Sequence, residues 1–191
     1  MTSLMQRQDT FQSDLLFNCS DFETDDDIFE SFPCKVELNP IIQNPDIRYG
    51  LLDDNNNTIF LNIFNETYFP SSGFCFKHLT QLDVRRTSFQ NGNNRIPAEI
   101  QYLAPTLTDI GIYDTIITHL PYEMSKLEKL QTIKFFNTSL MIFPDSIGNF
   151  LSLNFLSLPN NMLTSLPTTI VNNSKLRQIE LSNNPHLHSI Q

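Results

Sequence analysis

The C-terminal part of the chain repeats itself with a nearly fixed period, and this period constrains the fold more than any other feature. The apolar pattern LxxLxL begins at Leu79, Leu107, Leu130, Leu153 and Leu176, in steps of 28, 23, 23 and 23 residues. One such unit cannot bury its apolar side alone, so neighbouring units must stack to make a continuous core. The sequence therefore predicts a solenoid over residues 79–191.

Other positions of the unit repeat too, and we number them from its first apolar residue. Position 9 is always Thr or Asn, and an Asn there can donate to and accept from backbone groups that a buried turn would leave unpaired. An apolar-Pro step then predicts an extended or helical return, because Pro cannot donate to a strand ladder. The extra residues of the first unit, 90–95, are polar and predict a surface loop.

These features resemble the leucine-rich-repeat family, since residues 153–170, LNFLSLPNNMLTSLPTTI, nearly match its consensus LxxLxLxxNxLxxLPxxI. The resemblance implies an α/β solenoid, a right-handed superhelix whose short parallel strands line a concave face. We expect five repeats over 79–191, the last one truncated. The apolar residues of that uncapped C-terminal repeat predict self-association.

Residues 1–78 do not follow the repeat cleanly. We predict a disordered N-terminus over 1–14 and an irregular N-terminal cap over 15–78, with a degenerate repeat within it from about Asn56 to Pro70. Residues 1–58 hold 12 acidic and 3 basic side chains, whereas 59–191 hold 9 of each, so the net charge of −9 comes from the first part. The acidic run 20–30 predicts a loop or the edge of a helix.

The composition argues against several classes of function. An acidic chain without a basic footprint is not expected to bind nucleic acid. The five glycines lie far apart and none precedes Lys, which excludes the usual phosphate-binding loop. The CxxH pair of Cys75 and His78 lacks a second pair of ligands. We expect no enzyme, no cofactor, no metal and no membrane span in this chain; a metal-binding or enzymatic cap is the remote alternative.

The outward positions of the predicted strands carry the candidate binding residues. Adjacent strands lie about 4.8 Å apart, so position 7 places Arg85, Tyr113 and Phe136 in one column. Aromatic and Arg side chains are the types that dominate protein interfaces. The candidate partner-binding residues are Arg85, Tyr113, Phe136, Phe155, Asp109 and Lys134. An equal alternative is that the aromatic rings cover each other or stack on Arg85 without any partner.

Four observations bear on the compartment. A pair of cysteines before the repeats resembles the disulfide-stapled caps of extracellular leucine-rich-repeat proteins, which implies a bond between Cys19 and Cys34 and leaves Cys75 as a buried thiol. Asn-x-Ser/Thr sequons, each a candidate glycosylation site, occur at Asn18, Asn56, Asn65, Asn137 and Asn172. No signal peptide is visible, and the 23-residue unit is also similar to intracellular repeats of the Ras-group scaffold type.

The sequence therefore predicts a non-catalytic protein-recognition module that binds a protein partner on its concave strand face. We expect a receptor-like or adhesive signalling glycoprotein, extracellular or at the cell surface, whose export segment is missing from this chain. The alternative is a cytoplasmic scaffold in small-GTPase-type signalling.

Overall fold

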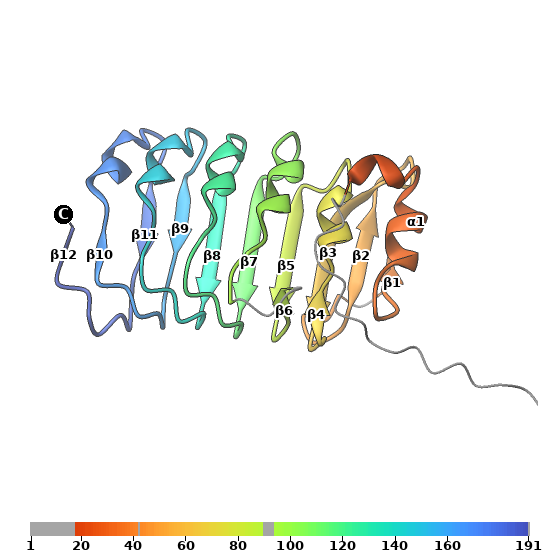
Figure 1. Ribbon diagram of the computed structural model, residues 1–191, viewed down its shortest axis with the longest axis horizontal. Coiled ribbons are helices and arrows are strands. Elements are labelled where there is room, and N and C mark those ends of the chain that lie inside the picture. The colour runs from red at the N-terminus through yellow and green to blue at the C-terminus, as the bar shows by residue number, and fades with distance from the viewer. Residues whose placement is uncertain (1–17, 42, 90–93, 191) are drawn as a thin grey trace, which may run out of the picture.

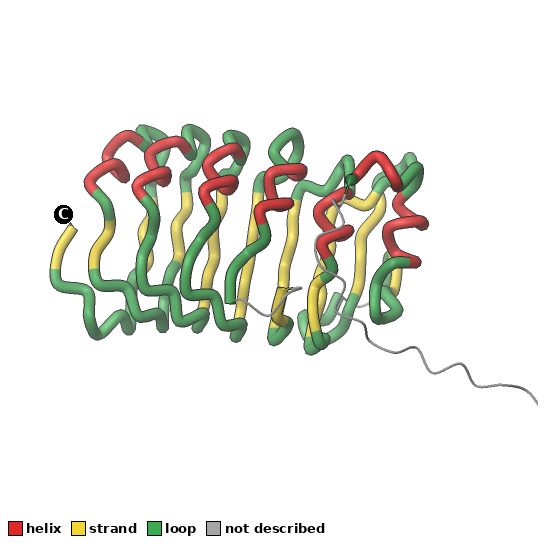
Figure 2. Tube along the Cα trace, in the orientation of Figure 1, coloured by secondary structure: helices red, strands yellow, loops and turns green. Residues whose placement is uncertain are grey.

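The computed structural model describes residues 18–41, 43–89 and 94–190, and the expected disordered segment 1–14 lies outside these ranges. Among them, eight strands form one sheet in the order β1-β2-β3-β5-β7-β8-β9-β11 (Figure 1). Short helical turns follow one another in a separate row, one for each turn of the chain (Figure 2). The predicted solenoid is confirmed.

The repeat strands lie side by side in a common register. They are β5 (Gln81–Arg85), β7 (Asp109–Tyr113), β8 (Thr132–Phe136), β9 (Phe155–Ser157) and β11 (Gln178–Glu180). All are parallel to their neighbours, and Leu82 pairs with Ile110, Ile110 with Ile133, and Ile133 with Leu156. Residues at equal positions therefore stack, and the apolar residues at positions 1, 4 and 6 of the first four repeats make one buried core.

Each return begins with the expected Pro and continues as a 3-10 helix. The helices are η2 (Ser71–Cys75), η3 (Ala98–Leu103), η4 (Tyr122–Lys126), η5 (Asp145–Asn149) and η6 (Thr168–Asn172). The preceding Pro has extended backbone in every case. Two short parallel pairs lie on this side, β4 (Tyr68–Phe69) with β6 (Ser88–Phe89) and β10 (Ser165–Leu166) with β12 (Ser189–Ile190).

Position 9 holds the units together through hydrogen bonds. The Asn161 amide nitrogen donates to the carbonyl oxygens of Phe135, Leu158 and Pro159 at 2.7–3.2 Å. Its oxygen accepts from the backbone nitrogens of Thr138 and Leu140 and from the Thr138 hydroxyl. This one buried side chain therefore satisfies groups of two repeats, as the sequence predicted.

We expect Asn161→Ala to lower the free energy of unfolding by about 3 kcal/mol or more, because it leaves several buried backbone groups unpaired. Urea denaturation measures the change. Asn149→Ala is the control, since Asn149 is exposed on η5 and its side chain makes no hydrogen bond within the described chain. Equal unfolding free energies for the two variants would contradict the stabilising role of the position-9 hydrogen bonds.

The N-terminal cap combines a hairpin with a short helix. It contains η1 (Cys19–Asp21), α1 (Asp25–Glu30), β1 (Glu37–Leu38), β2 (Tyr49–Leu52) and β3 (Thr58–Phe64). Strand β2 is antiparallel to β3, but β3 is parallel to β5 with Leu61 opposite Leu82, so β3 continues the register of the repeats. The acidic run forms η1 and α1, and the Asp25 carboxylate accepts a hydrogen bond from the Thr58 backbone nitrogen at 2.6 Å.

The expected pairing of Cys19 with Cys34 is wrong. Cys19 is bonded to Cys75, with their Cα atoms 5.2 Å apart, and Cys34 is a free, half-buried thiol. Both η1 and α1 pack against η2, which ends at Cys75, so the fold brings Cys19 beside that turn. Cys34 follows α1 and lies near Arg48; burial raises its pKa and the Arg48 charge opposes this. The pairing depends on how α1 folds back, which three cysteines in a sequence do not specify.

We expect Cys19→Ser to destabilise the protein by about 4 kcal/mol, because the bond closes a loop with a sequence separation of 56 residues. Cys34→Ser is the matched control and should change stability little. Denaturation of both variants under oxidising conditions measures this. The reverse ranking, or a peptide that links Cys19 to Cys34 in a non-reducing digest, would contradict the assignment.

Candidate protein-binding face

The residues at positions 3, 5 and 7 point away from the core along the sheet, because successive side chains of a strand alternate between its two faces. Position 7 gives a column of Phe64, Arg85, Tyr113 and Phe136, each paired with the next in the strand register. The structure therefore brings together the three residues that the sequence placed in one column, and it adds Phe64. We call this surface the concave face.

Arg85 is held from three sides at the N-terminal half of the concave face. Its Nη2 donates to Asp83 Oδ2 at 3.1 Å, and its Nε donates to Asn62 Oδ1 at 3.3 Å. The guanidinium carbon lies 3.6 Å from the centroid of the Tyr113 ring, a cation–π contact. Tyr113 therefore stacks on Arg85 within the protein, as in the alternative that the sequence left open. These contacts fix Arg85 before any partner binds.

Gly111 makes room for this cluster. A Cβ atom at Gly111 would lie 2.6 Å from the Tyr113 hydroxyl and closer still to Asp83 Oδ1, so only glycine lets both groups lie over the strand. Burial raises the pKa of Asp83, and Arg85 beside it opposes this. Burial, helped by the Asp83 charge, raises the pKa of Tyr113 to about 12. Asp83, Arg85 and Tyr113 form a partly buried polar cluster on the concave face.

The raised pKa of Tyr113 predicts a late ionisation. A raised pKa favours the protonated phenol in the folded state, so its stabilising contribution is present below the ordinary value of 10.0 and is lost as the pH rises through about 12. Absorbance at 295 nm should show a tyrosine ionisation near pH 12. Tyr113→Phe should remove that step and Tyr122→Phe should leave it. Its persistence in Tyr113→Phe would contradict the burial of the phenol.

Several side chains in the C-terminal half of the concave face reach solvent. Lys134 is exposed, its Nζ lies 5.7 Å from the centroid of the Phe155 ring, and it has no ion pair among the described residues. Phe136 is 39% exposed beside it. Asp109 accepts a hydrogen bond from the Thr108 hydroxyl at 2.7 Å. Among the six candidates, Lys134, Phe136 and Phe155 form the accessible aromatic and cationic group.

The sequence missed the part of the face that the cap contributes. Asn62 and Phe64 occupy positions 5 and 7 of β3, and extending the repeat register through the degenerate unit would have found them. Tyr49 joins them because β2 pairs with β3, and its ring lies 5.2 Å from that of Phe60. No periodicity signals Tyr49, since β2 runs antiparallel to the repeat strands.

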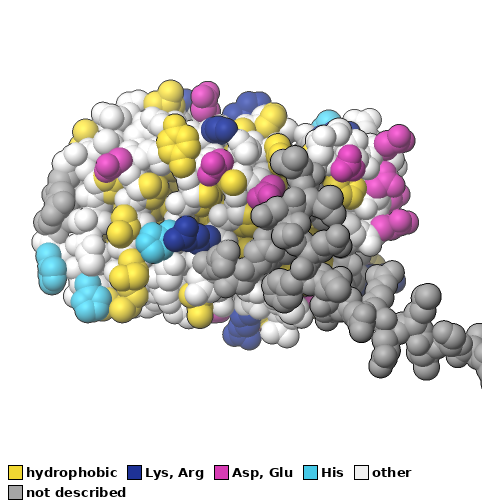
Figure 3. All heavy atoms as spheres, viewed as in Figure 1, with side chains coloured by type: hydrophobic (Ala, Val, Ile, Leu, Met, Phe, Trp, Pro, Cys, Tyr) yellow, Lys and Arg dark blue, Asp and Glu magenta, His cyan; other side chains and the backbone are white. Residues whose placement is uncertain are grey.

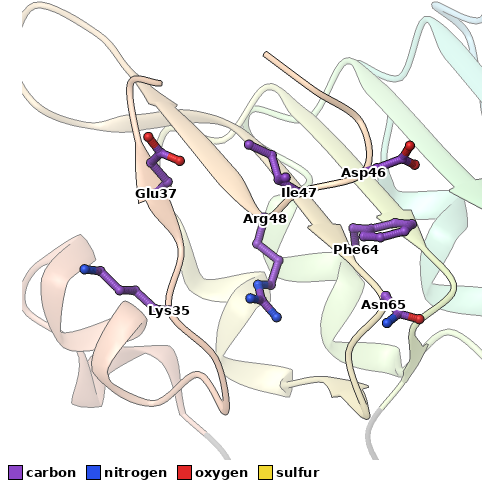
Figure 4. A pocket seen from close by; sticks show the side chains of 7 residues that line it. All are labelled: Lys35, Glu37, Asp46, Ile47, Arg48, Phe64 and Asn65. Atoms are coloured by element: carbon purple, nitrogen blue, oxygen red, sulfur yellow. The ribbon is translucent and has the colours of Figure 1, made fainter. Parts of the chain in front are cut away.

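The N-terminal end of the concave face is closed by the cap. The Asn62 amide nitrogen donates to the carbonyl oxygens of Pro45 and Ile47, which holds that loop over the sheet. A hollow of about 650 Å³ opens there beside Phe64 (Figure 4). Its charged side chains point in different directions, and Arg48 is paired with Glu66 outside the view. The hollow therefore offers no convergent set of ligands.

The rim of the concave face is formed by position 8, where the backbone is left-handed in every unit. The residues concerned are Asn65, Arg86, Asp114, Asn137, Asn160 and Asn183. Asn137 donates to Asp114 Oδ1 at 2.9 Å. All five sequon asparagines, Asn137 included, are exposed. Their glycosylation stays a prediction, and a glycan at Asn137 would stand at the edge of the face.

Two features of the described residues bear on other functions. Within these ranges no group of three or more His, Cys, Asp or Glu side chains is arranged to hold a metal ion. No helix in the part of the chain that the structure describes is long and apolar enough to cross a bilayer.

Two solved structures resemble part of the protein. A leucine-rich-repeat protein of Leptospira interrogans aligns at 25% identity over 59% of this chain and 33% of its own, with a TM-score of 0.48. The plant peptide hormone receptor RGFR1, solved in complex with RGF2, aligns at 21% identity over 65% of this chain and 22% of its own, with a TM-score of 0.52. No family model and no curated protein sequence matches.

The repeat register, the hydrogen bonds of position 9 and the likeness to the plant receptor agree. The protein has the leucine-rich-repeat fold, a right-handed α/β solenoid with parallel strands on the concave face. The chain spans less than half the length of either neighbour.

Proposed function

We propose that the protein is a non-catalytic recognition module that binds a protein partner on its concave face. The observation that carries the proposal is the group of Lys134, Phe136 and Phe155, two aromatic rings and an exposed cation on neighbouring strands. An exposed ring beside a cation is the kind of surface from which interface hot spots are built. The fold is also the one that a plant receptor uses in its complex with a peptide hormone.

The division of the concave face supports the same proposal. Asn62, Asp83 and Tyr113 fix Arg85 in the unbound protein, so a partner that touches Arg85 meets a side chain that has already lost its rotamer freedom. Such preorganisation favours affinity, because less side-chain entropy is lost on binding. The N-terminal half, where Arg85 is fixed, then orients the partner. The aromatic rings of the C-terminal half become buried against the partner and supply the apolar contact.

We further propose that the module works as a receptor-like or adhesive domain outside the cell or at its surface. The Cys19–Cys75 disulfide supports this, since structural disulfides persist in oxidising compartments. The exposure of the five sequon asparagines is compatible with glycosylation there. The disulfide favours this setting over a cytoplasmic scaffold.

Self-association through the C-terminal repeat, where Ile179 on β11 is 41% exposed, also stays a proposal.

Substitution of residues on the concave face tests the proposal, because it should weaken capture of the partner. Immobilised wild-type protein and the double variant Lys134→Ala with Phe136→Ala are incubated with surface extracts of the native cells, and bound proteins are quantified by mass spectrometry. We expect the specific partner to bind the variant about 30-fold more weakly, which corresponds to about 2 kcal/mol for a hot spot. Both side chains are exposed, so folding should be unaffected.

Tyr122→Ala provides the matched control, because Tyr122 is 72% exposed on η4, away from the strands. It should capture the partner as the wild type does. A folded double variant with undiminished capture of every specific partner would refute the concave face as the binding site.

A further inference from the structure

One sequon asparagine of the cap, Asn65, belongs to the wall of the hollow beside Phe64. It lies in the sequence Phe64-Asn65-Glu66-Thr67, directly after β3, and lines this hollow of about 650 Å³ together with Phe64. Figure 4 shows the two side chains next to each other at the end of the strand. The Asn65 side chain is exposed and makes no hydrogen bond within the described ranges, so its amide group is free to be modified.

Hydrogen bonds to the first repeat hold this sequon in one conformation. The Asn65 nitrogen donates to the Arg85 carbonyl oxygen at 2.9 Å, and the Glu66 nitrogen donates to the Thr87 hydroxyl at 3.0 Å. The backbone of Asn65 is left-handed with a φ of 55°, a conformation that asparagine adopts more readily than most residues with a Cβ atom. The side chains of Phe64 and Asn65 therefore keep a fixed relation to each other.

The hollow combines an aromatic ring with polar groups. Phe64 is half-buried, and the Arg86 guanidinium carbon lies 5.7 Å from the centroid of its ring. The face of such a ring is partly negative, so it attracts the C–H groups of a sugar as it attracts a cation. The other lining residues are Ile47 and four charged ones, Lys35, Glu37, Asp46 and Arg48. Hydrogen-bonding groups that point in several directions suit a sugar, because its hydroxyl groups also point in several directions.

We propose that Asn65 carries an N-linked glycan whose first sugar, an N-acetylglucosamine, packs on Phe64 in this hollow. The inference rests on the proposed setting outside the cell, because sequons are modified in secreted proteins. A transferase of the cell supplies the sugar from a lipid-linked oligosaccharide. The Asn65 amide nitrogen loses a proton and bonds to the anomeric carbon, and the bond from this carbon to the lipid pyrophosphate breaks. The pyrophosphate leaves with the bonding electron pair, and nothing is oxidised or reduced.

The other sequons lack this combination of features. Asn137 also follows a phenylalanine, but its amide nitrogen donates to Asp114 Oδ1 at 2.9 Å. The Asn18 side chain accepts a hydrogen bond from the Ser20 nitrogen at 3.1 Å. The two sequons that follow no aromatic residue are Asn56 and Asn172. Among the sequons of the described ranges, Asn65 alone combines a side chain without a hydrogen bond, a preceding aromatic ring and a place in the wall of this hollow.

A glycan at Asn65 would cover the cap end of the concave face and leave the exposed group accessible. Strands β5 and β7 lie between β3 and β8, and β8 carries Lys134 and Phe136. The sugar would take up the Phe64 ring, which then offers no surface to a partner. The glycan would therefore direct a partner to the C-terminal half of the face, and partner capture would not require it.

Glycopeptide mass spectrometry of the protein from its native cells tests the modification, and we expect a glycan at Asn65. A bare Asn65 in a protein that carries a glycan at another sequon would overturn this inference alone. Bare asparagines at all five sequons would overturn it together with the proposed setting outside the cell.

Thermal unfolding of the full chain, secreted by a eukaryotic host with an added export signal, tests the packing. The isosteric variant Thr67→Val removes the sequon, and Thr67 is exposed with no hydrogen bond from its hydroxyl in the described chain. We expect its melting temperature to lie about 2–4 °C below that of the glycosylated wild type, the shift for losing a contact as strong as an aromatic pair. Without glycosylation, in protein from the bacterial periplasm, the two should melt together.

Two further variants complete the test. Ser174→Ala removes the sequon of Asn172 in the same way and should leave the melting temperature unchanged, since no ring precedes that asparagine. In Phe64→Leu the glycan should no longer stabilise the protein, so adding Thr67→Val should change nothing more. Comparing glycosylated with unglycosylated protein of each variant removes the effect of the substitution on folding. Equal melting of the two wild-type forms, or a glycan effect undiminished in Phe64→Leu, would overturn the inference.

Discussion

The hydrogen bonds of position 9 are the interaction on which the rest of the solenoid depends. Where the chain leaves the sheet and turns toward the next 3-10 helix, buried backbone groups have no partner. The hydrogen bonds between strands do not extend to these groups. Asn161 and Asn184 each bond groups of their own repeat and of the one before it, so one side chain closes its own turn and fixes its neighbour. Thr87, Thr115 and Thr138 do part of this with a single hydroxyl each.

The hydrogen bonds of position 9 keep the repeats in register, and this explains why the concave face can carry a precise arrangement of side chains. Because equal positions stack in register, a residue at position 7 always faces the residues at position 7 of the two neighbouring repeats. Arg85 and Tyr113 stack for this reason, and the missing side chain of Gly111 gives them the space to do so. The face is rigid where Arg85 is bonded and open where Lys134 and Phe136 reach solvent.

The same register builds a second surface with a different character. Positions 10 to 13 carry no Asp, Glu, Lys or Arg in three successive repeats, unlike the strands of the concave face. A repeat protein can in this way present several surfaces that differ in chemistry while sharing one core, since each repeat position is expressed again in every unit.

The sequence by itself determined the solenoid, its period, the buried positions and the column of Arg85, Tyr113 and Phe136, because these follow from local spacing that stacking repeats unchanged. Only the tertiary structure decided the partner of Cys19, the place of Tyr49 beside the concave face and the anchoring of Arg85 by Asn62. Each of these depends on the cap, where β2 runs antiparallel and α1 packs against η2. Irregular segments are positioned by packing between residues far apart in the chain, and packing of that kind leaves no period in the sequence.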